Sequence, residues 1–337
     1  MKVLTITQLR KFESGQWRSD SLDALPREIG GDSVLWVDAQ DPSEAERQQL
    51  MSYFKLDSLD LDEFDEEGSR SKIEEVENQV SCLVCFPSRD QFMAEPKTKW
   101  LALTISDRWM LSVHKGYSNI TCEIYKKIST HGYFALSLAP STDILLYIIL
   151  DLIVNECFAV SDLVHERLQG VSQQAASRFR QMPKESNRTL GLEIAKSRDQ
   201  VLTLRQSIGP IREVVGKVAR GEFAIVSSVT LPRFEDLYDR TISLIEVVDT
   251  HREEIQDIVD IVINAQTLTT NNIIRVLTII SAIFLPLTLI AGIYGTDFGR
   301  GFFVPGTNSI YGFYVMISAM IIIVVGLISV FRRKGWL

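Results

Sequence analysis

The sequence predicts an α+β membrane protein, in which a soluble α/β and helical part precedes a long helix and two C-terminal transmembrane helices. Two observations support this prediction. The chain is 46% hydrophobic and 23% charged, which is too apolar for an ordinary soluble domain and too charged for a fully embedded one. Its C-terminal part also holds two long apolar segments, residues 273–294 and 311–331. A soluble body with a membrane part fits both observations.

Charge and cysteine usage exclude several classes of function. The formal net charge of -8 argues against nucleic acid as a partner, because phosphate-backbone binding needs clustered Lys and Arg. The four cysteines are too scattered for a disulfide framework, which favours a reducing compartment, the cytosol. Cys82 and Cys85 form a C-x-x-C pair, but they lie in a strand pattern, which favours a structural role over a metal or redox site. No catalytic constellation is present, so an enzyme is not expected.

Residues 1–222 are expected to form a cytosolic α/β and helical domain. The N-terminus has no signal-peptide core and is typical of a strand. Further strands are predicted at "SVLWVDA", "QVSCLVCFP", "WLALTIS" and "WMLSVH", with a helix at "PSEAERQQLMSYF". From about residue 119 the pattern is mostly helical. The apolar run 144–154 is too short to span a membrane and contains Asp151, so a buried core helix is predicted.

Residues 223–272 are predicted to form a stalk helix. Thr230 and Pro232 mark a helix start, and no further glycine or proline occurs before Pro286. A helix from Pro232 to Tyr294 would extend about 94 Å at 1.5 Å per residue. Apolar residues spaced by three and four predict a packing seam. These residues are Tyr238, Ile242, Ile245, Val248, Ile255, Val259 and Val262.

The two apolar segments are each long enough to cross a bilayer, which takes about 20 helical residues. A pair of buried soluble helices is the disfavoured alternative. Pro286 is tolerated in a membrane helix where neighbours compensate the freed carbonyl. The connecting loop, residues 295–310, has Arg300 as its only cation, whereas the tail 332–337 is basic. The positive-inside rule therefore places both termini in the cytoplasm.

One face of the long helix carries a polar stripe at alternating spacings of three and four. Its members are Glu253, Asp257, Asp260, Asn264, Thr267, Asn271, Ile274, Thr278, Ser281, Leu285, Thr288 and Gly292. Polar groups at bilayer depth are costly unless they face a bundle interior or water. Several copies around one axis would make this stripe a pore. The alternative is that the hydroxyls bond back to their own helix, which is common in membrane helices.

The residues that carry the stripe resemble a known family. The segment "NNIIRVLTIISAIFLPLTLIAGIYGTDF" (271–298) is similar to the first membrane helix and signature of the CorA magnesium/cobalt transporters, whose family includes a zinc-transporting ZntB branch. The stretches "EDLYDRT" (235–241) and "FRRKGWL" (331–337) resemble the stalk start and the basic C-terminus of that family. Weaker likenesses occur at "WVDAQDPSEAE" (36–46) and "SKIEEVENQV" (71–80).

The resemblance implies a funnel-shaped homopentamer in the bacterial inner membrane, with a cytosolic α/β/α domain and a stalk helix continuous with the pore-lining span. It implies transport of Mg²⁺, or of Zn²⁺, Co²⁺ or Ni²⁺, with a cytosolic divalent cation as regulatory ligand. Asp236 would bind that regulatory ion. The implied pore positions are an acidic ring at Asp260, a polar ring at Asn271, a hydrophobic gate at Ile274 and Leu277, and low-profile positions at Thr288 and Gly292.

The sequence departs from the family at its signature. The family has Gly-Met-Asn after the tyrosine, whereas Tyr294 is followed here by Gly295, Thr296 and Asp297. Five carboxylates in place of five amides would hold a divalent ion more strongly and raise one another's pKa. The expected metal ligands are thus Asp236, Asp260 and Asp297. A non-conducting, membrane-anchored cation sensor or scaffold with the same fold is the alternative to a transporter.

Overall fold

The structure is a computed structural model that describes residues 3–10, 13–19, 25, 33–56, 70–76, 78–116, 141–178, 184–295 and 310–336. The chain divides into two compact units, Met1–Ile258 and Val259–Leu337, which are described here one after the other. The division falls inside the predicted stalk, residues 223–272, because one helix contributes to both units.

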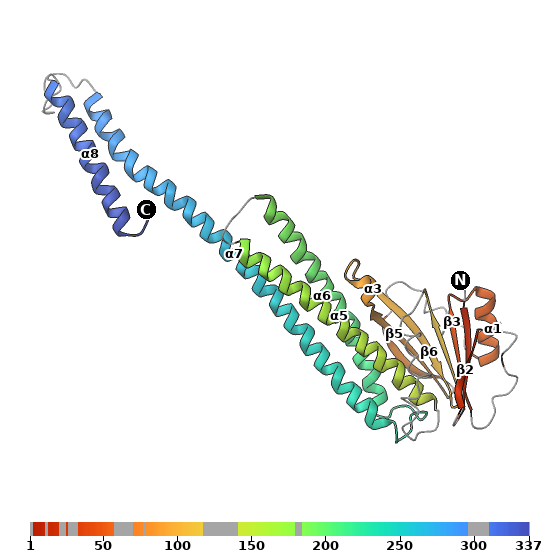
Figure 1. Cartoon of the computed structure of the whole chain (residues 1–337). Coiled ribbons are helices and arrows are strands. Elements are labelled where there is room, and N and C mark those ends of the chain that lie inside the picture. The colour runs from red at the N-terminus through yellow and green to blue at the C-terminus, as the bar shows by residue number, and fades with distance from the viewer. Residues whose placement is uncertain are drawn as a thin grey trace. The chain divides into compact units, whose positions relative to one another are not determined.

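The first unit is built on a seven-stranded sheet in the order β2-β1-β3-β7-β6-β5-β4 (Figure 1). Strands β3 and β7 pair in parallel, and every other pair is antiparallel. The strands are β1 (Val3–Arg10), β2 (Glu13–Ser19), β3 (Ser33–Gln40), β4 (Lys72–Val76), β5 (Gln79–Pro87), β6 (Thr98–Ile105) and β7 (Trp109–His114).

The four internal strand predictions are confirmed as β3, β5, β6 and β7, and the N-terminal strand is confirmed as β1. Strand β4 was not predicted from the sequence. It lies at the sheet edge, where Glu74 and Glu75 are exposed, and charged side chains are the usual protection of an edge strand. Asn78, at φ 74°, makes the turn from β4 into β5. The polarity that protects this edge also hides the strand from a hydrophobic pattern.

Helices cover the two faces of the sheet. Leu50 and Phe54 of α1 (Glu44–Phe54) belong to a core cluster with residues of β3, β5, β6 and β7. The opposite face lies against α5 (Thr142–Arg178) and α6 (Lys184–Ala219) (Figure 1). The short helix α3 (Arg89–Phe92) contacts α5. Strand β5 is buried almost throughout because both of its faces are covered.

The predicted core helix at residues 144–154 is confirmed within α5. Every residue of this run is buried except Tyr147, which is half-buried. Asp151, which interrupts the apolar run, accepts hydrogen bonds from Arg240 Nη1 of α7 (Leu231–Gly295) at 2.5 Å and from Asn155 Nδ2 at 3.1 Å. The carboxylate therefore connects α5 to α7, as expected of a residue in a core helix and not in a membrane span.

The predicted seam on α7 is displaced in the structure. Of its seven residues only Val248 and Ile255 are buried, and the other five are half-buried at its margin. The buried stripe consists of Phe234, Leu237, Thr241, Leu244, Val248, His251, Ile255 and Ile258. An apolar pattern misses it because Thr241 and His251 are polar. Thr241 satisfies its hydroxyl by donating to the Tyr238 carbonyl at 2.6 Å.

Gly216 sets the close approach of α6 to α7. A Cβ atom at Gly216 would lie 2.9 Å from Cε2 of Tyr238. We expect Gly216→Ala to lower the free energy of unfolding by about 1–2 kcal/mol, because the Tyr238 ring must move in a packed interface. The control is Gly170→Ala in α5, where an added Cβ meets no atom within 4 Å and should stabilise by about 0.5–1 kcal/mol. Thermal unfolding measures both variants. Equal Tm values for Gly216→Ala and Gly170→Ala would contradict this account.

The second unit contains the final part of α7 and α8 (Ile310–Arg333), which run in opposite directions (Figure 1). Helix α8 ends in a Schellman motif: Trp336 N donates to Phe331 O at 2.9 Å, and Gly335 N donates to Arg332 O at 3.1 Å. Gly335 has a φ of 67°, and the Trp336 ring stacks on Phe331 at 5.8 Å. The basic end of the chain thereby has a defined conformation.

Candidate functional site

The polar stripe of α7 is exposed along its whole predicted length. All twelve of its residues, from Glu253 to Gly292, are exposed. The helix is continuous from Leu231 to Gly295, with Pro286 inside it, so the predicted register of three and four is kept. The stalk and the first apolar segment are therefore one helix with one polar face.

Three threonines on this face bond back to their own helix. The hydroxyls of Thr267, Thr278 and Thr288 donate to the carbonyls four residues earlier, at 3.0, 2.8 and 2.7 Å. The alternative stated for hydroxyls in membrane helices is thus confirmed for Thr278 and Thr288, but not for Ser281, for which no such bond is found among the described residues. Each threonine oxygen keeps lone pairs that can accept a hydrogen bond.

The amides of the stripe behave differently from its threonines. Asn264 and Asn271 are exposed, and neither side chain has a hydrogen-bond partner among the residues that the structure describes. An amide has two donors and an acceptor that need partners, from water or from another chain. Asn264 lies in the predicted stalk, Asn271 lies two residues before the first apolar segment, and Ser281, which also lacks a partner among the described residues, lies inside that segment.

The remaining faces of α7 in the second unit are apolar. One face of α7 is half-buried, and α8, in the same unit, has a half-buried stripe from Met316 to Ile328. Large apolar side chains are exposed on both sides of the polar stripe. Ile273, Val276, Leu277, Ile280 and Phe284 lie on one side and Leu289 and Ile293 on the other, each at least 44% exposed. An exposed apolar surface that extends over about 18 helical residues is typical of contact with lipid or with further copies of the helix.

Of the three predicted metal ligands the structure describes Asp236 and Asp260, and it does not bring these two together. Asp236 and Asp260 are both exposed on α7, 24 positions apart, which is about 36 Å along a helix. Tyr294 is half-buried and Gly295 ends the helix, whereas Thr296 and Asp297 lie outside the described residues, as does Arg300. A site that uses Asp236 or Asp260 therefore needs ligands from other residues, other chains or water.

Three described helices are long and apolar enough to cross a membrane by length and composition: Thr142–Ala176, Leu231–Gly295 and Phe313–Arg333. In the first helix, 78% of the apolar 18-residue stretch is buried inside the first unit. In the other two helices, 6% and 0% of the corresponding stretch is buried. The two predicted spans are thus the two that present unburied apolar surface.

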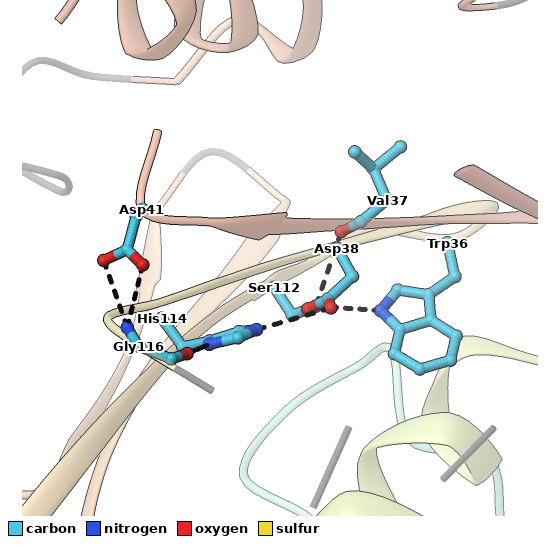
Figure 2. A network of polar contacts seen from close by, with 7 residues as sticks. All are labelled: Trp36, Val37, Asp38, Asp41, Ser112, His114 and Gly116. Carbon is cyan, nitrogen blue, oxygen red and sulfur yellow. Dashed lines mark hydrogen bonds and ion pairs between the residues drawn. The ribbon is translucent and has the colours of Figure 1, made fainter. Parts of the chain in front are cut away.

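Two other groups of polar residues are structural. Figure 2 shows Ser112 donating to Asp38 at 2.5 Å and accepting from Trp36 at 2.9 Å. His114 faces Asp38 through Nε2 (3.4 Å) and the carbonyl of Gly116 through Nδ1 (2.9 Å). Burial lowers the pKa of His114, but these two acceptors outweigh burial and raise it above its ordinary value. The cluster holds β3 to β7. Its signal in the sequence is that polar residues alternate with apolar ones in both strands, Asp38 in β3 and Ser112 and His114 in β7.

The C-x-x-C pair is confirmed as part of a strand. Cys82 and Cys85 lie in β5 as buried, reduced thiols, and they point to opposite faces because they are three residues apart. Burial raises the pKa of Cys85 to about 11 and raises that of Cys82 further. Neither thiol is therefore a thiolate at neutral pH, which disfavours metal or redox chemistry.

Comparison with known proteins places this geometry in a family. The family model described as CorA-like Mg²⁺ transporter protein matches residues 31–333. The chain belongs to this CorA-like family. Among CorA-like relatives, the cobalt/magnesium transport protein CorA of Thermotoga maritima is 25% identical over 290 residues, which are 86% of this chain and 79% of that protein. The zinc transport protein ZntB of Pectobacterium carotovorum is 23% identical over 145 residues, 43% of each chain.

The CorA-like fold extends over the whole chain. The complete structure of the CorA magnesium transporter from Methanocaldococcus jannaschii matches with a TM-score of 0.81 at 23% identity, covering 99% of both chains. The predicted family and its α/β soluble part with long helices are thereby confirmed. The pentamer, the ion and the roles of individual residues stay predictions.

Proposed function

We propose that this chain is a subunit of a homopentameric, passive transporter of divalent metal cations, in which the polar stripe of α7 lines the central axis. One observation carries the proposal: Ser281 lies inside the apolar segment 273–294, is exposed, and has no hydrogen-bond partner among the described residues, in register with the exposed amide of Asn271 at the start of that segment. Unpartnered polar groups are costly in apolar surroundings unless they face water or one another. A ring of stripes around an aqueous axis meets this requirement.

In this proposal each predicted site residue has a role set by its chemistry. Asn271 forms a polar ring, and Ile274 and Leu277, which are 54% and 62% exposed in one chain, form a hydrophobic gate. Asp260 and Asp297 attract cations at the cytosolic and outer ends of the stripe. The further pore positions are Asn264, Thr278, Ser281, Leu285, Thr288 and Gly292. Asp236 binds a regulatory cytosolic cation between subunits.

The membrane potential is a sufficient driving force for inward movement. A divalent cation gains about 4.6 kcal/mol per 100 mV, since each elementary charge gains about 2.3 kcal/mol. The proposal therefore needs no enzyme activity.

The proposal also includes a membrane topology. By the positive-inside rule, both termini lie in the cytoplasm and the two apolar helices cross the bacterial inner membrane, with Arg332, Arg333 and Lys334 at the cytosolic side. Magnesium is the first candidate ion, followed by Zn²⁺, Co²⁺ and Ni²⁺.

A second candidate function keeps the fold without transport. A non-conducting cation sensor or scaffold is favoured by two observations. The signature carries Asp297 where the family has asparagine, and Thr278 and Thr288 satisfy their hydroxyls within α7, so they need no aqueous axis. The exposed Ser281 and Asn271 oppose this alternative.

Ion flux into proteoliposomes distinguishes the two functions. We expect the purified protein to admit divalent cations selectively when Mg²⁺, Zn²⁺, Co²⁺ and Ni²⁺ are compared. We expect Asp297→Asn to weaken the apparent cation affinity by roughly tenfold, about 1.4 kcal/mol, because five carboxylates are lost from the outer ring. The matched control is Asp199→Asn, which makes the same charge change on the exposed surface of α6.

Each outcome has a defined meaning. Flux that shifts with Asp297→Asn but not with Asp199→Asn supports a transporter whose affinity is set at Asp297. Flux that neither variant changes keeps the transporter but removes Asp297 from its selectivity. No flux of any ion by intact pentamers contradicts transport and leaves the sensor.

A further inference from the structure

A cluster of three potential metal ligands lies between α5 and α7, apart from the polar stripe. His165 comes from α5, and His251 and Glu254 come from α7, one helical turn apart. His165 Nδ1 lies 3.4 Å from Glu254 Oε2, and His251 Nδ1 lies 3.7 Å from the same oxygen. The ligand atoms of all three residues lie within 4.8 Å of one another.

The Nδ1 atoms of both histidines are buried without a hydrogen bond to any described residue. His251 is only 4% exposed, so its unpartnered nitrogen has no route to bulk water. Glu254 Oε2 is within ion-pair distance of both nitrogens, yet neither contact has hydrogen-bond geometry. A buried polar atom without a partner is unfavourable, and a bound cation would give both nitrogens a partner.

The other nitrogen of each ring already has a partner. His251 Nε2 lies 3.0 Å from Ser161 Oγ, and His165 Nε2 lies 2.9 Å from Gln169 Nε2. An amide nitrogen only donates, but the oxygen and nitrogen of a side-chain amide exchange places when the group is turned over. With Oε1 of Gln169 turned toward the ring, each Nε2–H donates to an oxygen, and both Nδ1 atoms keep a lone pair for a cation. Metal-binding histidines are held in this way by a second hydrogen bond, which fixes the tautomer and the ring orientation.

An ion pair explains the cluster less well. The two imidazole rings stack with centroids 5.3 Å apart, so two protonated rings would repel each other. Burial lowers the pKa of His251, and the neighbouring His165 lowers it further, against the opposing effect of Glu254. Neutral imidazole is the form that binds metal ions.

We propose that His165, His251 and Glu254 bind a transition-metal cation, such as Zn²⁺ or Co²⁺, in the soluble unit. Two imidazole nitrogens and one carboxylate are a known zinc ligand set, which leaves a fourth position for water. Tetrahedral bonds of about 2.0–2.1 Å separate ligand atoms by about 3.4 Å. The two nitrogen–oxygen separations of 3.4 and 3.7 Å are close to this value, and the two imidazole nitrogens lie within 4.8 Å of each other, so a bound ion would draw the two rings together. Mg²⁺ prefers oxygen ligands in octahedral geometry, so the site selects against it.

The test is metal binding by the purified full-length protein in detergent, after treatment with a chelator. Millimolar Mg²⁺ in the buffer fills sites made of oxygen ligands alone. Co²⁺ reports nitrogen ligation and low coordination number through its visible absorption, and calorimetry gives the Zn²⁺ affinity. These measurements do not require the protein to conduct ions, so they stand whether or not the proposed transport is correct.

The variants are Glu254→Gln and His165→Asn, both at partly exposed positions, compared with Glu246→Gln at an exposed position two turns earlier on α7. We expect about one strongly absorbing Co²⁺ per chain in the wild type and in Glu246→Gln. Glu254→Gln and His165→Asn should each weaken Zn²⁺ binding by at least about tenfold. Zn²⁺ should raise the Tm of the wild type but not of Glu254→Gln.

Two results would overturn the proposal. One is a Co²⁺ spectrum of the wild type that equals that of the hydrated ion. The other is that Glu254→Gln and His165→Asn both bind Zn²⁺ with the wild-type affinity. Their metal-free Tm must equal the wild-type value for this comparison. A loss of binding that accompanies normal metal-free stability assigns the ligands to these three residues.

Discussion

Replacing Gly292 with tryptophan is expected to lower divalent cation flux by about 100-fold or more, equivalent to ~2.7 kcal/mol of added barrier. Gly292 is the last residue of the α7 stripe, and a Cβ added there meets no atom within 4 Å in the chain itself. The substitution should therefore leave the single subunit intact. If five copies of the stripe surround one axis, five indole rings would fill that axis and exclude the ion.

The control for this prediction is the same substitution at Gly326 of α8, where an added Cβ also meets no atom within 4 Å. We expect Gly326→Trp to retain flux within about twofold, because α8 lies away from the stripe and an apolar ring is tolerated in lipid. Gly292→Ala should give an intermediate rate. Equal flux in both tryptophan variants, with the oligomer intact by gel filtration, would show that the stripe does not line the pathway.

The two apolar helices could be predicted from the sequence because their signal is local. A segment of the required length without acidic residues has few alternatives to a membrane span. The core helix at 144–154 required one further observation, the carboxylate of Asp151. The structure shows that this carboxylate accepts from Arg240, a residue in a different helix. The acidic residue in the run correctly indicated a buried core helix instead of a membrane span. The reason that a carboxylate is tolerated there is its contact with Arg240 of another helix.

The seam of α7 shows where a hydrophobic pattern fails. The buried stripe alternates by three and four without a break, but Thr241 and His251 occupy two of its positions. An apolar pattern skips both positions and selects the neighbouring residues Ile242, Ile245 and Val259. Burial of these polar residues depends on a backbone carbonyl for Thr241 and on Ser161 for His251. Neither partner is visible as periodicity.

The polar stripe was predictable in register but not in the state of its side chains. Helical spacing alone places Asn264, Asn271 and Thr278 on one face. Whether a hydroxyl bonds to its own helix depends on a side-chain rotamer, which the residue type does not fix. The cluster of His165, His251 and Glu254 was not predicted, because it needs the packing of α5 against α7.

Replacing Asp143 with alanine is expected to lower the free energy of unfolding by about 3 kcal/mol, and the Tm by about 6 °C or more. Asp143 lies in the first turn of α5 and is 2% exposed. Its Oδ2 accepts from Ser227 N at 3.0 Å and from Thr230 Oγ1 at 2.5 Å, and its Oδ1 accepts from Ser141 Oγ. The carboxylate therefore ties the start of α5 to the start of α7.

The loss is expected because alanine removes one acceptor that Ser141, Ser227 and the buried Thr230 share. Thr230 is 1% exposed, and its backbone carbonyl accepts from Arg233 N at 3.0 Å in the first turn of α7. The matched control is Asp199→Ala on the surface of α6, which should change stability by less than about 0.5 kcal/mol. Thermal unfolding in detergent, followed by tryptophan fluorescence, measures both variants. Equal Tm values for the two variants would contradict the proposed tie.

The pH dependence separates this tie from simple loss of packing. Burial raises the pKa of Asp143, but the donors Ser141, Thr230 and Ser227 outweigh burial and lower it below its ordinary value. A carboxyl whose folded pKa is depressed stabilises the protein above its unfolded pKa, about 3.9, and loses this contribution as the pH falls through the folded value. The Tm difference between wild type and Asp143→Ala should therefore be constant from about pH 5 to 7 and shrink below about pH 4. A lost methylene packing contact has no such titration, so a difference that stays constant at low pH would assign the effect of Asp143 to volume instead of charge.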